Sequence, residues 1–426
     1  MIARGLEYAR KRTGGAEIRA SAERASAASY EDDKLKKVWA SQSTHVAVRV
    51  IVNGKLGHAS GTDPVEIEPV VDRAVELAAF GSEAPFTFPG PAPAREVKTY
   101  DPAVEQTARE ELVAQGGVVV DRVKAYNPEI KVHAETGWSV GEGRLMNTSG
   151  LDVTSRGSSY YGYGYGDLVR GTDMLFVGRY RHWRKKDYDP ERICREVIGD
   201  YRLAERNAAV ESKQMPVIFT PRGARVLLMP VLMGINGKSV LKGDSPLAGK
   251  LGERLCDPRF TLVDDGTVDY APDSRPYDHE GTPRRRNAVI TKGVLNCFLY
   301  DLDTAAKAGA QSTGNGPGCG ASNVLVSAGD TPFAELVRST KEGVIVESVM
   351  GLGQGNIING DFSVNISLGF KIESGEIVGR VKNVMLAGNA YDALKRIEAI
   401  ASEPEWYGST CAPAIKVAEL SVVAKE

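Results

Sequence analysis

The sequence is poor in the residues that most often carry hydrolytic or redox chemistry. Its 426 residues include five cysteines and five histidines. The cysteines are scattered, odd in number and never spaced as Cys-x-x-Cys. This pattern fits neither a disulfide framework nor a zinc ribbon, and it is typical of a reducing compartment.

Zinc hydrolysis of the usual helical kind is also excluded, because no histidine has a second histidine within five positions. The one His-Glu pair, His279-Glu280, is followed by Gly-Thr-Pro, which cannot continue a helix. We therefore expect His279 to be a loop histidine, with metal ligation as the minor alternative. No Gly-x-Ser-x-Gly elbow for serine catalysis is present. A cysteine nucleophile stays open as an alternative, because the sequence cannot show whether a base lies near any cysteine. Cys319 is the most loop-like candidate. We favour a buried or idle thiol over a nucleophile for it.

No segment predicts a membrane span or a secretion signal. The longest apolar run, residues 226–235, is too short to cross a bilayer and contains Pro230. The first residues predict a short helix that ends at Gly14-Gly15. The formal net charge is −2, so no global field would recruit nucleic acid. The short basic clusters at 181–186 and 284–286 are expected to be solvated edges or turns, and we expect a cytoplasmic protein without a nucleic-acid or membrane partner.

The length and composition predict two domains of an ordinary globular protein, with 42% hydrophobic and 25% charged residues. The chain becomes richer in short strands and in Gly/Pro loops near residues 211–215. We place an N-terminal domain at residues 1–212 and a C-terminal domain at residues 213–426. The predicted class is α+β: an antiparallel sheet with helices, followed by a β-rich domain with long Gly-rich loops.

Local signals place several elements. Asp63-Pro64, Asp101-Pro102 and Asp189-Pro190 each put a capping carboxylate before a proline at the first helical position. The helix after Asp101 is expected to run to about Lys124, with a bend at Gly116-Gly117. Residues 16–60 are predicted to form a meander of strands at 16–33, 34–42 and 44–54, turning into 55–60 at the Asn53-Gly54 hairpin. Residues 130–184 are β-rich, and shorter strands are predicted at 217–220, 287–293 and 294–301.

The most unusual stretch is MGLGQGNIINGDFSV, residues 350–364, with glycine at 351, 353 and 355. A β-rich segment, 343–350, precedes it, and the alternating residues 361–372 that follow predict a half-buried strand. A phosphate-binding loop needs a helix there and a closing Lys-Ser or Lys-Thr, so a strand-to-strand connection is favoured over a nucleotide site.

A second unusual stretch is SSYYGYGYGD, residues 158–167. Read as a strand, it places Tyr161, Tyr163 and Tyr165 on one face and three glycines on the other. One interpretation is an aromatic platform for an extended peptide. The favoured alternative is tyrosine packing, with the glycines admitting a neighbouring element.

Residues 341–389, in full context, resemble the C-terminal core of the TldD/PmbA family, whose members are known as modulators of DNA gyrase and as metallopeptidase subunits. Residues 16–60 resemble the family's opening meander, and residues 277–301 its Asp-x-Glu-Gly-Thr element. The resemblance covers most of the chain in the family's order. It implies dimers and peptide substrates.

The family has two branches. The TldD-like branch carries His-Glu-x-x-x-His on a helix, with a C-terminal cysteine completing the zinc site. The TldE/PmbA-like branch lacks the histidines and pairs with the first. Here the corresponding stretch is 224–238, with Met229 and Pro230 in place of His-Glu and Gly234 near the second histidine, while Cys411 stands near the third ligand.

Met and Gly cannot replace imidazoles on zinc, and proline supplies no general base. Without zinc, the lowering of the pKa of bound water from 15.7 to about 7 is lost. The resemblance therefore implies a non-catalytic subunit with no catalytic residue, no metal ligand and no cofactor of its own, zinc being expected only in a TldD-like partner. A homodimer is possible in isolation.

The tyrosine row and the glycine loop are the candidate peptide contacts under this resemblance: Tyr161, Tyr163, Tyr165, Gly351, Gly353, Gln354, Gly355 and Asn356. Bare backbone can hydrogen-bond an extended peptide by strand addition. Two alternatives stay open: a self-sufficient peptidase that uses an unrecognised site, and a regulatory protein that acts on a DNA-linked partner.

Overall fold

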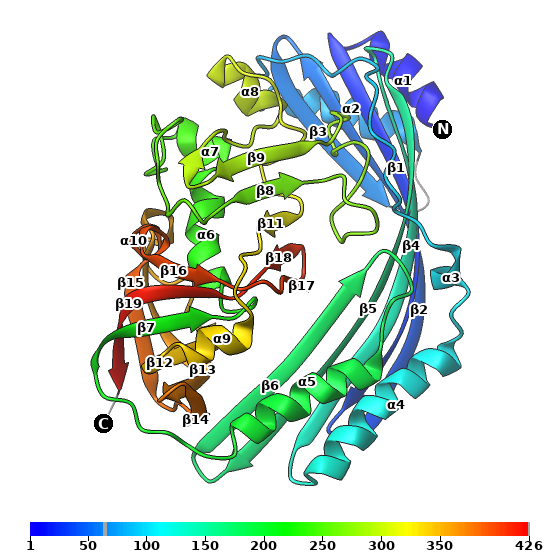
Figure 1. Ribbon diagram of the computed structural model, residues 1–426. Coiled ribbons are helices and arrows are strands. Elements are labelled where there is room, and N and C mark those ends of the chain that lie inside the picture. Colours follow the sequence, from blue (N-terminus) through cyan, green and yellow to red (C-terminus); the bar gives the residue numbers. More distant parts are fainter. Residues whose placement is uncertain (63–65, 425–426) are drawn as a thin grey trace.

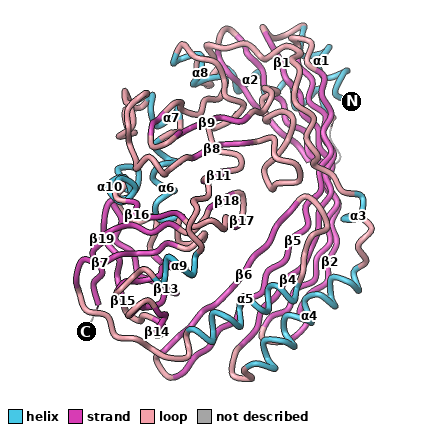
Figure 2. Tube along the Cα trace, viewed as in Figure 1, coloured by secondary structure: helices cyan, strands magenta, loops and turns pink. Residues whose placement is uncertain are grey.

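The computed structural model describes residues 1–62 and 66–424. The N-terminal half is built on one antiparallel sheet of long strands in the order β3-β2-β1-β4-β5-β6. Figure 2 shows these strands running side by side along much of the molecule. Their bounds are β1 Gly15–Glu31, β2 Lys34–Val52, β3 Lys55–Thr62, β4 Lys131–Asn147, β5 Asp152–Arg170 and β6 Asp173–Trp183.

Helices cover one face of this sheet (Figure 1). Helices α1 and α2 pack on β1, β2 and β3, while α4 and α5 pack on β1, β4, β5 and β6. Alternation along the strands sends Ile18 and Val48 toward α1 and α2, and it leaves Arg19 and Arg49 on the opposite side, hereafter the helix-free face. The helices are α1 Ile2–Arg10, α2 Ile67–Ala78, α3 Pro102–Glu105, α4 Arg109–Tyr126 and α5 Pro190–Leu203.

Two further sheets form the C-terminal half. In one, β12 pairs with both β7 and β13, so the pairings β12-β7-β19-β15-β13 close on themselves. The other runs β10-β9-β8-β11-β18-β17. The strands are β7 Lys213–Phe219, β8 Leu262–Asp265, β9 Arg286–Thr291, β10 Val294–Leu295, β11 Val324–Val326, β12 Glu342–Met350, β13 Asp361–Glu373, β14 Glu376–Arg380, β15 Val384–Asn389, β16 Ile397–Ile400, β17 Glu405–Tyr407, β18 Thr410–Ala412 and β19 Ile415–Ala424.

Short helices complete this half: α6 Arg225–Gly234, α7 Gly237–Leu241, α8 Leu302–Ala308, α9 Phe333–Arg338, η1 Ile357–Asn359 and α10 Ala390–Lys395. The two halves share a hydrophobic cluster in which Val197 and Tyr201 of α5 join Ile345 and Phe370. Within the described ranges, no helix combines the length and apolar character needed to cross a membrane.

The α+β class is confirmed, and several local predictions hold. Asp101 and Asp189 accept backbone hydrogen bonds at the starts of α3 and α5. Asn53 and Gly54 both have positive φ in the β2–β3 hairpin. Strand β13 alternates buried and exposed side chains as predicted. The Asp63-Pro64 cap lies outside the described residues.

Other boundaries were wrong. The predicted strands at 34–42 and 44–54 form one strand, β2, because both pair continuously with β1. The helix after Asp101 is interrupted at 106–108 instead of bending at Gly116-Gly117, where the two glycines lie against the ring of Tyr30. Strand β10 is only two residues long.

Candidate functional site

The tyrosine row lies on the helix-free face of the N-terminal sheet. Tyr161, Tyr163 and Tyr165 are half-buried on β5. The rings of Tyr163 and Tyr165 stack with centroids 5.8 Å apart, and His133 of β4 stacks on Tyr165 at 4.6 Å. The Tyr161 hydroxyl donates to Oε1 of Glu135 at 2.8 Å. The row is thus an ordered, half-buried aromatic surface, in which Tyr165 also contacts the ring of Phe176 at 5.1 Å.

The glycines of the same strand allow neighbouring side chains to pack closely on the other face of the sheet. A Cβ on Gly162 would lie 2.3 Å from the ring of Tyr188, and one on Gly164 would lie 2.5 Å from Val119 of α4. A Cβ on Gly166 would come equally close to Ile130. The predicted role of these glycines, to admit a neighbouring element, is what the structure shows.

The glycine loop is a strand-to-strand connection, as expected. It joins β12 to β13, which are antiparallel neighbours, and only the single 3-10 turn η1 lies between them. Gly351, Gly353 and Gly355 all have positive φ, a backbone region that favours glycine. Gly353, Gln354, Gly355 and Asn356 are exposed.

The structure places the two candidate peptide-contact elements on different parts of the molecule. The end of the glycine loop packs on α6 through η1 in the C-terminal half, whereas the tyrosine row belongs to the N-terminal sheet (Figure 1). One bound peptide would therefore have to be long, or the two elements would serve separate contacts.

Helix α6 occupies the place where the family resemblance puts the zinc motif. Pro230 lies inside the helix, and Met229 is half-buried. The Tyr391 hydroxyl donates to the carbonyls of Pro230 and Ile358, at 3.0 and 3.1 Å. A Cβ on Gly234 would lie 2.6 Å from that hydroxyl oxygen. The space beside Gly234 is therefore filled, and these residues do not fit a zinc ion.

The cysteines do not supply an activated nucleophile either. Burial raises the pKa of Cys194 and Cys411 to about 11 and that of Cys256 to about 12. Burial also raises the pKa of Cys297 and Cys319. A thiol with a raised pKa stays protonated at neutral pH and is a poor nucleophile.

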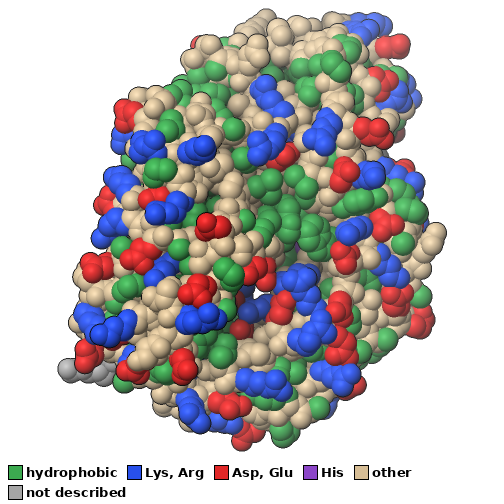
Figure 3. All heavy atoms as spheres, in the orientation of Figure 1, with side chains coloured by type: hydrophobic (Ala, Val, Ile, Leu, Met, Phe, Trp, Pro, Cys, Tyr) green, Lys and Arg blue, Asp and Glu red, His purple; other side chains and the backbone are tan. Residues whose placement is uncertain are grey.

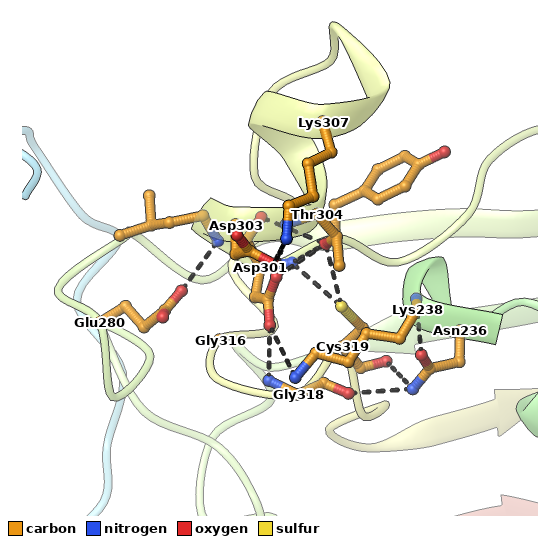
Figure 4. Close-up of polar contacts among 12 residues, drawn as sticks. Asn236, Lys238, Glu280, Asp301, Asp303, Thr304, Lys307, Gly316, Gly318 and Cys319 are labelled. Carbon is orange, nitrogen blue, oxygen red and sulfur yellow. Dashed lines mark hydrogen bonds and ion pairs between the residues drawn. The ribbon is translucent and has the colours of Figure 1, made fainter. Parts of the chain in front are cut away.

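Cys319 belongs to a structural network between α7 and α8 (Figure 4). Its sulfur lies 3.1 Å from the Thr304 hydroxyl and accepts from the backbone N–H of Asp301 at 3.3 Å. Asp301 caps α8 through the Thr304 N–H and also accepts from the Gly318 N–H at 2.8 Å. Lys238 lies 3.6 Å from the same carboxylate. The thiol therefore helps to hold the loop in place.

Glu280 connects the two halves, a role that local sequence reasoning missed. Its side chain is buried and accepts from Arg49 Nη1 of β2 at 2.8 Å and from the backbone N–H of Leu302 at 2.9 Å. Arg49 also donates to Glu17 at 2.9 Å. The Asp-x-Glu-Gly-Thr element was the available signal, but its partners come from distant strands.

A cavity of about 370 Å³ lies where β6 and α5 meet the C-terminal half. Arg179 of β6 pairs there with Asp200 at 2.6 Å and with Glu347 at 3.2 Å. Desolvation, opposed by Arg179 and aided by Glu347, raises the pKa of Asp200 to about 7. The space-filling view shows a hollow between the halves, bordered by basic and acidic side chains (Figure 3).

The prediction that both basic clusters are solvated was wrong for their arginines at 181, 184 and 284. All three are half-buried, whereas Arg285 and Arg286 are exposed. The reason is tertiary: Arg184 follows β6 and Arg284 belongs to the loop before β9, and folding brings them close enough that Arg284 lowers the pKa of Arg184.

Comparisons with known proteins agree with this architecture. A family model described as the PmbA/TldA metallopeptidase C-terminal domain matches residues 212–424, and one for domain 1 of the same metallopeptidases matches residues 16–78. A metalloprotease PmbA homologue of Haemophilus influenzae is 25% identical over 94% of this chain and 90% of its own length.

Two solved structures are similar over 99% of both chains, each with a TM-score of 0.91. One is TldE from Thermococcus kodakarensis, at 24% identity, which shows the fold alone. The other, at 26% identity, is a Thermotoga maritima protein described as a proposed modulator of a DNA gyrase.

Proposed function

Since this chain belongs to the PmbA/TldD metallopeptidase family, we propose that it is a TldE/PmbA-like, non-catalytic subunit whose TldD-like partner supplies the zinc and the catalytic residues. The observation that carries this proposal is the composition and packing of α6. Met229, Pro230 and Gly234 offer no imidazole and no base, and Tyr391 fills the space beside Gly234. Cys411 alone does not make a zinc site.

The chain's own contribution would be to hold the substrate peptide. The half-buried tyrosine row offers an aromatic surface that tolerates many sequences. The exposed backbone of 351–356 can add hydrogen bonds to an extended chain. Both features suit a subunit that serves varied peptides in a heterodimer, and they are compatible with a homodimer in isolation.

The test is reconstitution with a TldD-like subunit that carries an intact His-Glu-x-x-x-His. We expect the mixture to hydrolyse an unstructured peptide much faster than either protein alone, and a chelator to abolish this activity. Light scattering should show a dimer. A matched mixture with the first histidine of the partner replaced by alanine should be inactive, because the metal site lies there.

Metal content provides a second measurement. After dialysis, the purified chain should hold far less than one zinc per chain. About one zinc per chain, turnover by the chain alone, or turnover that persists with the mutated partner would contradict the subunit role and favour a self-sufficient peptidase.

A regulatory role on a DNA-linked partner is the remaining alternative, suggested by the description of the Thermotoga maritima structure. The net charge of −2 does not favour it.

A further inference from the structure

Four arginines meet between the helix-free face and the C-terminal half with no acidic partner. They are Arg19 of β1, Arg184 just after β6, and Arg275 and Arg284 of the loop before β9. Within the described part of the chain, none of the four forms an ion pair or donates a side-chain hydrogen bond. The Nε atoms of Arg184, Arg275 and Arg284, and Nη1 of Arg284, are buried without a partner. Such donors are costly to leave unpaired.

A cavity of about 490 Å³ adjoins this cluster, and Arg19, Arg184, Arg275 and His279 line it. We call it the arginine pocket. Acidic residues also line the cavity, namely Glu23, Glu142, Asp273 and Asp278. Unpaired guanidinium groups gathered at one side of a partly desolvated cavity nevertheless raise the local positive potential and attract an anion.

Other arginines of the same cavity are paired. Arg144 makes two hydrogen bonds to Asp152, at 2.8 and 2.6 Å, and Arg156 pairs with Glu105 and Glu142. Carboxylates are therefore available nearby, yet they do not reach the four unpaired arginines.

The buried acid of the pocket is already satisfied. Asp278 accepts from the backbone N–H groups of Glu280, Thr282 and Gly316 at 2.7 to 2.9 Å. Asp273 also lines the cavity and lies near Arg184 and Arg275, but it forms no ion pair with either.

The titration of the pocket residues reflects this excess of positive charge. Desolvation and the neighbouring Arg284, Arg184 and Arg19 lower the pKa of Arg275 to about 10. His279 stays exposed at the edge, and partial desolvation together with the arginines lowers its pKa to about 3. His279 is thus neutral at neutral pH and adds no further charge.

The pocket adjoins the start of the tyrosine row. Ser159, two residues before Tyr161 on β5, lines it, and its hydroxyl lies 2.9 Å from His182 Nε2. His182 also lines the pocket and is the β6 neighbour of Tyr161. A chain that lies along the tyrosines would therefore bring one end to the arginines.

We propose that the arginine pocket binds a carboxylate of an extended peptide that lies along the tyrosine row. Guanidinium groups match carboxylates in paired hydrogen bonds. The assignment rests on the proposed peptide-binding role of the chain. It adds a preference for peptides whose C-terminal carboxylate or acidic side chain reaches the pocket.

Calorimetric titration of the purified chain tests the proposal with three N-acetylated octapeptides of alanine, serine and tyrosine. The first has a free C-terminal carboxylate, the second is its C-terminal amide, and the third is an amide with one internal glutamate. We expect at least one carboxylate-bearing peptide to bind about tenfold or more tighter than the plain amide. The first peptide reports a C-terminal carboxylate and the third an acidic side chain.

Variants distinguish binding in the pocket from a general effect of positive charge on peptide affinity. Arg275→Met and Arg184→Met should reduce binding of the preferred peptide to the level of the plain amide. Arg338→Met removes the same charge from an exposed, paired arginine of α9 outside the pocket and should change affinity by less than about twofold. Arg275→Met should also raise the melting temperature without ligand, since it relieves repulsion; a purely structural arginine would lower it.

The proposal is overturned if the three peptides bind alike, if none binds, or if only inorganic phosphate binds. These outcomes are independent of the subunit role, which is measured as turnover with the partner. If the chain supports turnover by its partner but binds the acid and amide peptides equally, the pocket proposal is refuted and the subunit role stands. Preferential acid binding without turnover would refute the subunit role alone.

Discussion

Replacing Glu280 with alanine should destabilise the protein substantially, because this carboxylate joins the two halves. It pairs with Arg49 of the N-terminal sheet and accepts the first free N–H of α8, from Leu302. The side chains of Glu280 and Glu17 are 4% exposed and that of Arg49 is 19% exposed, so water cannot fully replace the lost carboxylate.

The magnitude follows from what remains after the substitution. Breaking a buried ion pair by removing one partner typically costs about 3–5 kcal/mol. Arg49 keeps Glu17, at 2.7 Å, which argues for the lower end. The orphaned Leu302 N–H adds about 1 kcal/mol. We therefore expect Glu280→Ala to lower the free energy of unfolding by about 3–4 kcal/mol, and Glu280→Gln to cost less because it retains an acceptor for Leu302.

The assay is urea denaturation followed by both circular dichroism and tryptophan fluorescence, since separate transitions would reveal uncoupled halves. Asp152→Ala is the matched control: it also removes a carboxylate from an arginine, but the side chains of that Arg144–Asp152 pair are 48% and 42% exposed. Its cost should stay below about 1 kcal/mol. The reasoning is refuted if the two alanine variants lose equal stability.

Three further results are expected. Gly164→Ala should destabilise by about 1–3 kcal/mol in thermal or chemical unfolding because its Cβ would clash with α4, whereas Gly199→Ala, with open space on α5, should stabilise by up to about 1 kcal/mol. His279 has a folded pKa below its unfolded value, so its contribution to stability is complete above about pH 6.5 and is lost as pH falls toward 3. His279→Asn should flatten that part of the stability–pH curve; an unchanged curve would count against the arginine environment. Tyr161→Ala with Tyr163→Ala should lower peptide turnover by the reconstituted pair at an unchanged melting temperature, and full turnover would make the row purely structural.

Local chemistry made much of the fold predictable. Asp101 and Asp189 act through neighbours two positions away, Asn53-Gly54 closes its own turn, and β13 carries its burial pattern in its alternation. Each signal involves residues close in sequence, so no tertiary information was needed.

The parts that sequence could not supply depend on distant partners. The sequence predicts two strands at 34–42 and 44–54, yet continuous pairing with β1 makes them one. Arg184 and Arg284 each belong to a run of basic residues that is typical of a solvent-exposed segment. Only folding brings the two residues near each other. Glu280 likewise meets Arg49 from 231 positions away.

Because of the packing of α6, we expect that introducing histidines alone would not create a zinc site in this chain. Any side chain at 234 must displace the Tyr391 hydroxyl and Leu247, and Tyr391 is fixed by two carbonyls. Pro230 also stands at the position where the family motif carries its glutamate. Helix α6 is therefore a packing element of the C-terminal core, while the arginine nitrogens without partners, on Arg184, Arg275 and Arg284, lie between the helix-free face and the C-terminal half. In the proposed heterodimer, the TldD-like partner would supply the chemistry and this chain would hold the peptide.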